Sequence, residues 1–219
     1  MTGRVEQLRD HWWWRPGWQV GARYLTWHLV VDDQPEVCAA VRRYQEALRN
    51  VAVLDVVPRR WLHLTLSGVG FVTEVSVAER VAVVDAVARR LSRLPRFSVL
   101  LGGAEVGAEA VVLPVRDPGP FELLRDALRG GASDALGPDR VADRASSVRP
   151  HLSVAYVNGT AEAGRVRALL DTAELERVSP PRTRLVVHAV SLIELGRDDR
   201  RYTWSTMGRV PLGPRVERG

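Results

Sequence analysis

The stretch Trp61-Leu62-His63-Leu64-Thr65-Leu66-Ser67 has a counterpart later in the chain, Arg149-Pro150-His151-Leu152-Ser153-Val154-Ala155-Tyr156. Both contain the pattern His-Leu-(Thr or Ser)-aliphatic. Alternate residues of a β-strand point to the same face. Each stretch, folded as a strand, therefore places an imidazole and a hydroxyl side by side while its aliphatic side chains face the core. Two such pairs facing one another would make a polar site.

The elements predicted around these two stretches follow the same order in both halves of the chain. In the first half we predict a strand over 24–31, a helix from Pro35 to 48, a short strand over 51–57, the His63 strand, a helix after the capping box Ser76-x-x-Glu79, and a strand over 97–101. In the second half we predict a strand over 110–115, a helix from Pro118 to about 135, the His151 strand, a helix over 161–172, and strands over 183–194 and 201–207. This order predicts an α+β fold in which a βαββαβ-like unit is duplicated, with a lobe break near 102–109.

The domain prediction has three parts: an N-terminal Trp-rich appendage over 1–21, one two-lobed domain over 22–213, and a tail over 214–219. The appendage contains His11-Trp12-Trp13-Trp14-Arg15-Pro16-Gly17-Trp18. Such indoles either stack nucleic-acid bases or pack onto the body of the protein. We favour packing, because basic residues do not alternate with the tryptophans, and we find no evident partner for His11.

Composition restricts the class of protein. The chain has 219 residues, of which 46% are hydrophobic, enough for one large domain or two small lobes with a shared core. No apolar run approaches the roughly 20 residues that span a bilayer, and the first residues do not form a secretory signal. We therefore expect a cytoplasmic protein. Cys38 is the single cysteine, which excludes an internal disulfide, and we expect it to be buried.

The formal net charge is +5, and all 31 basic residues are arginines. Arginine suits bidentate contacts with phosphate, so the charge balance is compatible with an anionic ligand or RNA. The 26 acidic residues are scattered among the arginines, however, and no long basic run occurs. We therefore interpret most of the arginines as solvated surface charge.

The paired motifs resemble those of the two-histidine (2H) phosphoesterase superfamily, in particular the bacterial RNA 2′,3′-cyclic phosphodiesterases, also called 2′-5′ RNA ligases. The resemblance covers roughly residues 22–213. It implies two lobes with antiparallel sheets flanking a central cleft, and chemistry at a phosphodiester without metal, ATP or another cofactor. It also implies that His63 and His151 are the catalytic acid and base and that Thr65 and Ser153 bind phosphate oxygens.

This chain departs from the family pattern at two positions. Many members have arginine five residues after the second histidine and an aromatic residue five after the first. Here these positions are Tyr156 and Gly68. The departures concern how the phosphate and the base are held, and they leave the pair of histidines intact.

Elementary chemistry supports the same roles. Hydrolysis of a cyclic phosphate needs one group that takes a proton from water and another that gives a proton to the departing ribose oxygen. Histidine, with an ordinary pKa near 6.5, performs either task at neutral pH. The hydroxyls of Thr65 and Ser153 would stabilise the charge that develops on the non-bridging oxygens.

Five further residues are candidates for substrate binding: Arg149, Tyr156, His28, Tyr24 and Tyr202. Arg149 shares strand parity with His151 and Ser153, which makes it a candidate anion contact, although a solvent-exposed arginine would look the same. His28 and Tyr24 lie opposite the apolar face of their strand, which favours the cleft, while a structural role for His28 stays open. Tyr156 and Tyr202 would stack a nucleobase or pack in the core.

Three more segments or residues receive predictions. The polar stretch 143–148 has the character of a substrate-side loop. Trp204 could stack a nucleobase at the cleft edge, but we expect a packing role for it. His188 lies in a long apolar run, and we expect it to be structural.

Three functions are consistent with these residues. The first is a metal-independent phosphodiesterase that hydrolyses 2′,3′-cyclic phosphate RNA ends or a related nucleotide phosphodiester, including 2′-5′ linkages. The second is a non-catalytic nucleotide- or RNA-binding module that uses the same cleft. The third is a metallohydrolase that uses His28, His63 and His151, although the chain lacks a closely spaced ligand cluster. The expected partners are RNA ends or a small nucleotide, without a membrane, and the expected state is a monomer.

Overall fold

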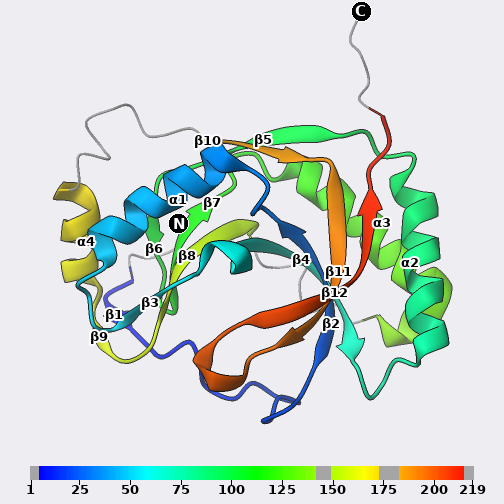
Figure 1. Ribbon diagram of the computed structural model, residues 1–219, viewed down its shortest axis with the longest axis horizontal. Helices are drawn as coiled ribbons and strands as arrows, with labels where there is room; N and C mark the ends of the chain where they lie inside the picture. Colours follow the sequence, from blue (N-terminus) through cyan, green and yellow to red (C-terminus); the bar gives the residue numbers. More distant parts are fainter. Residues whose placement is uncertain (1–4, 142–148, 173–182, 215–219) are drawn as a thin grey trace, which may run out of the picture.

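The computed structural model describes residues 5–141, 149–172 and 183–214. Two four-stranded antiparallel sheets form its centre (Figure 1). The first sheet has the order β12 (Thr203–Pro211), β11 (Ala189–Gly196), β2 (Tyr24–Val30) and β4 (His63–Phe71). The second has the order β3 (Leu54–Val56), β8 (His151–Val157), β7 (Ala110–Pro114) and β6 (Glu105–Val106). Each sheet thus contains one strand that begins at a motif histidine.

Two small sheets and four helices complete the fold. Strand β5 (Phe97–Leu101) pairs with β10 (Thr183–Val187), and β1 (Gln7–Leu8) pairs with β9 (Ala161–Glu162). Helices α1 (Pro35–Leu48) and α4 (Ala163–Thr172) lie on one side of the molecule, and α2 (Val77–Leu91) and α3 (Gly119–Leu136) on the other (Figure 1). Short 3₁₀ turns are η1 (Arg59–Trp61), η2 (Pro138–Arg140) and η4 (Asp198–Arg200). No helix in the described part of the chain has the length and apolar character that crossing a membrane requires.

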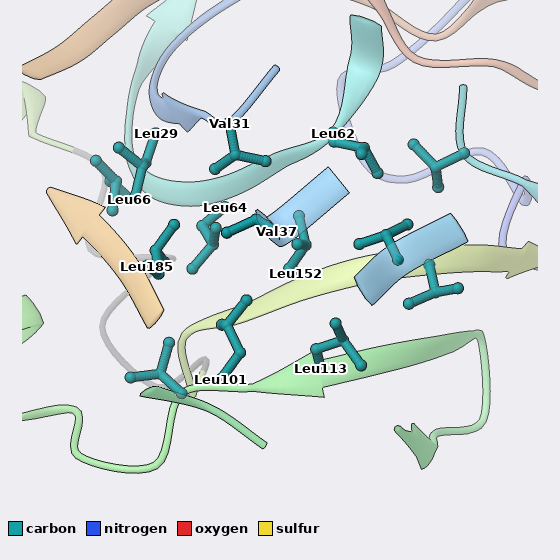
Figure 2. Packing of buried hydrophobic residues seen from close by; sticks show 14 of the residues in the cluster. Leu29, Val31, Val37, Leu62, Leu64, Leu66, Leu101, Leu113, Leu152 and Leu185 are labelled. Atoms are coloured by element: carbon teal, nitrogen blue, oxygen red, sulfur yellow. The ribbon is translucent and has the colours of Figure 1, made fainter. Parts of the chain in front are cut away.

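The strand alternation predicted from the sequence is confirmed. Leu64 and Leu66 of β4, and Leu152 of β8, are fully buried. Figure 2 shows the two motif strands contributing to one core from opposite sides. This core also contains Leu29, Val31, Val37, Leu62, Leu101, Leu113 and Leu185. Because neighbouring residues of a strand point to opposite faces, the histidine and hydroxyl of each motif lie on the side away from these leucines.

The strand predicted over 183–194 is wrong in one respect, because the structure divides it at His188. Strand β10 pairs with β5, whereas β11 joins β2 and β12 in the first large sheet. The apolar run continues through the division because residues on both sides of it are buried. Hydrophobicity alone therefore does not reveal that the chain changes sheet.

The spacing of Val77, Val81, Val84, Ala88 and Leu91 predicts the buried face of α2, and this prediction is also partly wrong. Val77 and Val81 are exposed, while Val83, Val87 and Leu91 face the core. Alanines and valines occupy most positions of this helix, so its hydrophobic spacing fits more than one face. The predicted capping box of Ser76 and Glu79 is present.

The start of α1 differs from the prediction as well. Asp32 and Asp33 precede this helix, and their residue type predicts that one of them caps it. The N-cap residue is instead Gln34, which makes no side-chain capping bond. The Gln34 amide instead donates to the Val186 carbonyl at 3.0 Å and accepts from the Val186 N–H at 2.9 Å. The start of α1 is therefore held by a contact with β10. Cys38 is buried in the same helix, as expected.

Both large sheets contain strands from each side of the predicted lobe break near 102–109. Strands β11 and β12 join β2 and β4, and β3 joins β8, β7 and β6. The short strand β6 lies within the break itself. The division of the chain into domains remains a prediction.

Candidate active site

One cleft of about 580 Å³ is lined by every residue that the sequence predicted for the site. The four predicted catalytic residues in its wall are His63, Thr65, His151 and Ser153, and the five predicted substrate-binding residues are Arg149, Tyr156, His28, Tyr24 and Tyr202. They come from both large sheets and from the chain just before or after their strands. The polar faces of the two motif strands therefore meet in one cavity. The predicted loop over 143–148 lies outside the described residues.

The two motif histidines are held in the same way. The Nδ1 atom of His63 lies 2.8 Å from the carbonyl oxygen of Trp61, and Nδ1 of His151 lies 2.8 Å from the carbonyl oxygen of Arg149. A carbonyl only accepts, so in each ring Nδ1 carries the proton and donates. In the neutral ring Nε2 is then the unprotonated atom. Each carbonyl belongs to the residue two positions before its histidine, so both motifs use one local arrangement.

Burial determines the charge of these two histidines. It lowers the pKa of His63 to about 4, because desolvation outweighs the hydrogen bond to Trp61, and His151 lowers it further. Burial also lowers the pKa of His151, against the bond to Arg149, and the nearby Arg125 guanidinium acts in the same direction. Both imidazoles are therefore neutral at pH 7.

His28 supports the first motif from the neighbouring strand. Its ring stacks on that of His63 with centroids 4.2 Å apart and planes inclined by 2°. Its Nε2 lies 3.4 Å from Oγ1 of Thr65. Burial, followed by the proximity of His63, keeps its pKa well below the ordinary value, so His28 is neutral. Trp204 packs its ring edge-on against His28 and His63, which confirms the packing expected for it.

The predicted absence of a partner for His11 is wrong. Its ring stacks on Tyr156 with centroids 4.3 Å apart, and its Nε2 lies 2.9 Å from the Tyr202 hydroxyl. Tyr156 is buried, and one face of its ring is covered by His11. A nucleobase therefore does not have that face available. Burial raises the pKa of Tyr156 above its ordinary value, so the phenol stays neutral.

The Trp-rich segment packs onto the body, as the favoured interpretation predicted for it. Leu8 and Trp12 are buried in the core, and the His11 N–H donates to the Val157 carbonyl of β8 at 2.8 Å. Trp13 and Trp14 remain about half exposed. The segment also contributes His11, Arg15 and Trp18 to the wall of the cleft.

Arg125 is a cleft residue that sequence reasoning missed. It lies on α3, is buried, and donates from Nε to the Leu66 carbonyl at 3.1 Å and from Nη2 to the Thr65 carbonyl at 3.4 Å. The helix thus places a guanidinium group directly beside the first motif strand. The available signal was an arginine four residues after Phe121 on the apolar face of this helix.

Sequence reasoning also missed three other cleft residues, Arg15, Trp18 and Arg197. They approach the cleft from segments far from the motifs in the sequence.

Within the described ranges, no group of three histidine, cysteine, aspartate or glutamate side chains is placed to hold a metal ion.

The sequence model of the 2′-5′ RNA ligase superfamily matches residues 33–199, which contain both histidine motifs. The chain belongs to this superfamily. The resemblance to 2H phosphoesterases that the two motifs indicated is thereby confirmed. A search of curated proteins finds no match.

Solved structures share the fold of this chain. TT0787 of Thermus thermophilus is 20% identical in sequence to this chain, and its structure matches with a TM-score of 0.63. The match covers 87% of this chain and 98% of TT0787. Escherichia coli LigT complexed with 3′-AMP is 19% identical, with a TM-score of 0.61 over 87% of this chain and 98% of that one. A third structure, described as a phosphoesterase, is 18% identical, with a TM-score of 0.61 over 88% and 99% of the two chains. These similarities confirm the α+β fold predicted from the sequence.

Proposed function

We propose that this protein is a metal-independent phosphodiesterase that hydrolyses 2′,3′-cyclic phosphate at RNA ends or a related nucleotide phosphodiester, including 2′-5′ linkages. The observation that carries the proposal is the matched pair His63 and His151. Each imidazole has its Nδ1 bonded to a carbonyl, and each is followed two residues later by a hydroxyl that lines the same cleft. Membership of the 2H phosphoesterases supports a phosphodiester as the reacting group.

The reaction follows from these groups. Nε2 of one histidine takes a proton from water while the water oxygen bonds to phosphorus. The bond from phosphorus to one ribose oxygen breaks, and protonated Nε2 of the other histidine donates a proton to that oxygen. The hydroxyls of Thr65 and Ser153 donate to the non-bridging oxygens, where charge accumulates. At the end the base carries a proton and the acid has lost one. Proton exchange with the solvent restores both rings.

The cleft also supplies positive charge near the two histidines. Arg125 and Arg149 both line it, and the Arg149 side chain is about half exposed, with Nη1 4.0 Å from Glu105. Burial lowers the pKa values of both histidines. A bound phosphate anion raises the pKa of a neighbouring imidazole, because it stabilises the charged form. In the proposed mechanism the substrate therefore assists protonation of the histidine that acts as acid.

A nucleotide is the substrate class that the relatives support. LigT structures have been solved in complex with 3′-AMP, ATP, phosphate and NADP⁺. By analogy with that fold, we expect RNA ends or a small nucleotide as the partner here. The monomeric state, the absence of a cofactor and the cytoplasmic location remain predictions.

Hydrolysis of adenosine 2′,3′-cyclic phosphate and of an oligoribonucleotide ending in a 2′,3′-cyclic phosphate, both in excess chelator, tests the proposal. We expect turnover to a 2′-phosphate product. If folded protein binds these compounds without turnover, the non-catalytic binding module is the correct function. If turnover disappears in chelator and returns with added metal, the metallohydrolase is the correct function.

A further inference from the structure

We infer that the cleft contains a second anion subsite, formed by Arg197 and Arg15, which binds the 5′-phosphate of the nucleotide whose 2′,3′-cyclic phosphate lies at His63 and His151. This inference rests on the proposed function and adds to it. It makes a nucleotide with two phosphate groups, such as the last residue of an RNA chain, a better substrate than a cyclic mononucleotide.

Arg197 is a buried arginine that forms no ion pair with a described carboxylate. It directly follows β11, lines the cleft, and is only 4% exposed. Its Nη2 donates to the His11 carbonyl at 3.1 Å. In the part of the chain that the structure describes, Nη1 has no hydrogen-bond partner, and no carboxylate lies within ion-pair distance of the guanidinium. Burial of an unpaired cation costs free energy, which an anionic ligand would offset.

Aromatic rings hold the Arg197 guanidinium in place. Its Cζ lies 5.6 Å from the Trp18 ring, 5.8 Å from Trp12, 5.9 Å from Tyr202 and 6.0 Å from Trp14. Cation–π contacts stabilise a guanidinium through the faces of the rings and use none of its in-plane N–H donors as hydrogen bonds to oxygen. The group is therefore positioned by neutral side chains and retains capacity for a phosphate.

Arg15 lines the same cleft, and its carbonyl accepts at 3.0 Å from the N–H of Trp18, the residue whose ring contacts Arg197. Its Nη2 lies 3.0 Å from Glu109, which also pairs with Arg9 at 3.0 Å. One carboxylate thus faces two guanidinium groups. Among the described residues, Nε of Arg15 is buried without a hydrogen-bond partner. The local balance is positive, and that favours an anion.

The Tyr202 ring lies between the proposed subsite and His63. The Tyr202 ring is 6.2 Å from the His63 ring and 5.9 Å from the Arg197 guanidinium. In the first sheet, His28 pairs with Ser191 and Tyr24 pairs with Leu195, so Arg197 lies at the Tyr24 end of β2. Four residues of strand separate that end from His28 by roughly 13 Å. A ribose fits between an anion at the histidines and an anion at Arg197.

Aromatic side chains at the same end provide a surface for the base. Trp18 and Tyr24 both line the cleft, are partly exposed, and have ring centroids 6.0 Å apart. Nucleobases stack readily on such rings. The Tyr24 end of the cleft therefore combines a stacking surface with two guanidinium groups, which together match a nucleoside 5′-phosphate.

The test compares adenosine 2′,3′-cyclic phosphate with the same compound carrying a 5′-phosphate. In the wild-type protein we expect the 5′-phosphate to raise kcat/KM by about 10- to 100-fold, the effect of one or two charge-assisted hydrogen bonds. Arg197→Gln keeps a donor for the His11 carbonyl, and we expect it to bring the ratio of the two kcat/KM values close to one. Arg184→Gln removes the same charge from an exposed position on β10 and should leave the ratio unchanged.

Equal kcat/KM values for the two compounds in the wild type would overturn the inference. So would an equal loss for both compounds in Arg197→Gln, because a structural role alone predicts that result. If Arg197→Gln fails to fold, Arg15→Gln takes its place, with the same expectation for the ratio. If the wild type hydrolyses neither compound, calorimetric binding separates the two claims. Tighter binding of the 5′-phosphorylated compound, lost in the variant, would support the subsite while the proposed function fails, and equal binding would reject both.

Discussion

His63 and His151 show how one backbone bond and burial together define a proton-transfer pair. The carbonyls of Trp61 and Arg149 fix the proton on Nδ1 in each ring and leave Nε2 for the substrate. Burial keeps both rings neutral at pH 7. A neutral ring can act as the base, whereas the histidine that acts as the acid has to be protonated first. In the proposed mechanism, a bound anion favours protonation of the histidine that acts as the acid.

A pH dependence follows from these lowered pKa values. The base is active above its pKa, and the acid is active below its own. Because both pKa values lie below 6.5, that of His63 is about 4, and kcat/KM reports the free enzyme, kcat/KM should peak below pH 6.5. The profile of kcat should lie at higher pH, because bound phosphate raises both values. Steady-state rates between pH 4 and 9 measure both profiles, and a kcat/KM optimum at pH 8 or above would contradict this account.

At the scale of elements, α2 and α3 pack so closely that one position requires glycine. A Cβ atom at Gly131 would lie 2.6 Å from Val87 Cγ2 and 2.9 Å from the Val87 backbone. At the adjacent Gly130, the atoms nearest to a Cβ would be those of the Arg90 guanidinium, the end of a flexible side chain that is paired with Asp134. The helices therefore approach through Gly131, while Gly130 faces their more adaptable edge.

We expect Gly131→Ala to lower the free energy of unfolding by about 1–3 kcal/mol, because the α2 backbone has to shift. Gly130→Ala is the matched control. It should be neutral or stabilising, because alanine favours a helix by about 1 kcal/mol over glycine, although the ion pair of Arg90 with Asp134 at 2.7 Å is disturbed. Urea denaturation of both variants provides the comparison. Equal effects would show that the close contact has no special importance.

The alternation of apolar and polar residues was enough to predict the strands that carry the motifs. Features that depend on contacts between distant parts of the chain could not be predicted. Strand β4 was predictable because its apolar residues alternate with His63 and Thr65. The division of the last long strand at His188 was not, because the partners β5 and β2 lie far away in sequence. The same reason explains why the sequence did not place Arg197 in the cleft, since its position depends on packing against the N-terminal segment.

For the molecule as a whole, several buried histidines make the folded state sensitive to acid. Burial lowers the pKa of His11 to about 3 and that of His63 to about 4, and it keeps that of His28 well below 6.5. Below pH 6.5 the unfolded chain binds protons that the folded chain does not. The stability associated with these groups is therefore complete above pH 6.5 and is lost as the pH falls towards 4.

We expect the free energy of unfolding to decrease from pH 7 to pH 4.5, by up to about 1.4 kcal/mol per pH unit for each such histidine. His28→Gln should reduce this slope, because it removes one group whose pKa differs between the two states. His188→Gln is the control, since His188 is partly exposed and lies next to Asp33 and Arg209. Urea titrations at several pH values measure the slopes. A stability that is flat over this range would be inconsistent with neutral buried histidines.

The pair His63 and His151 is tested most directly by the turnover of a 2′,3′-cyclic nucleotide by His63→Ala and His151→Ala, with His188→Ala as a matched histidine outside the cleft. We predict that each motif variant loses about 10²- to 10⁴-fold in kcat, keeps the circular dichroism spectrum of the wild type, and that His188→Ala stays fully active. Wild-type turnover by a folded His63→Ala, His151→Ala double variant would contradict the two-histidine mechanism.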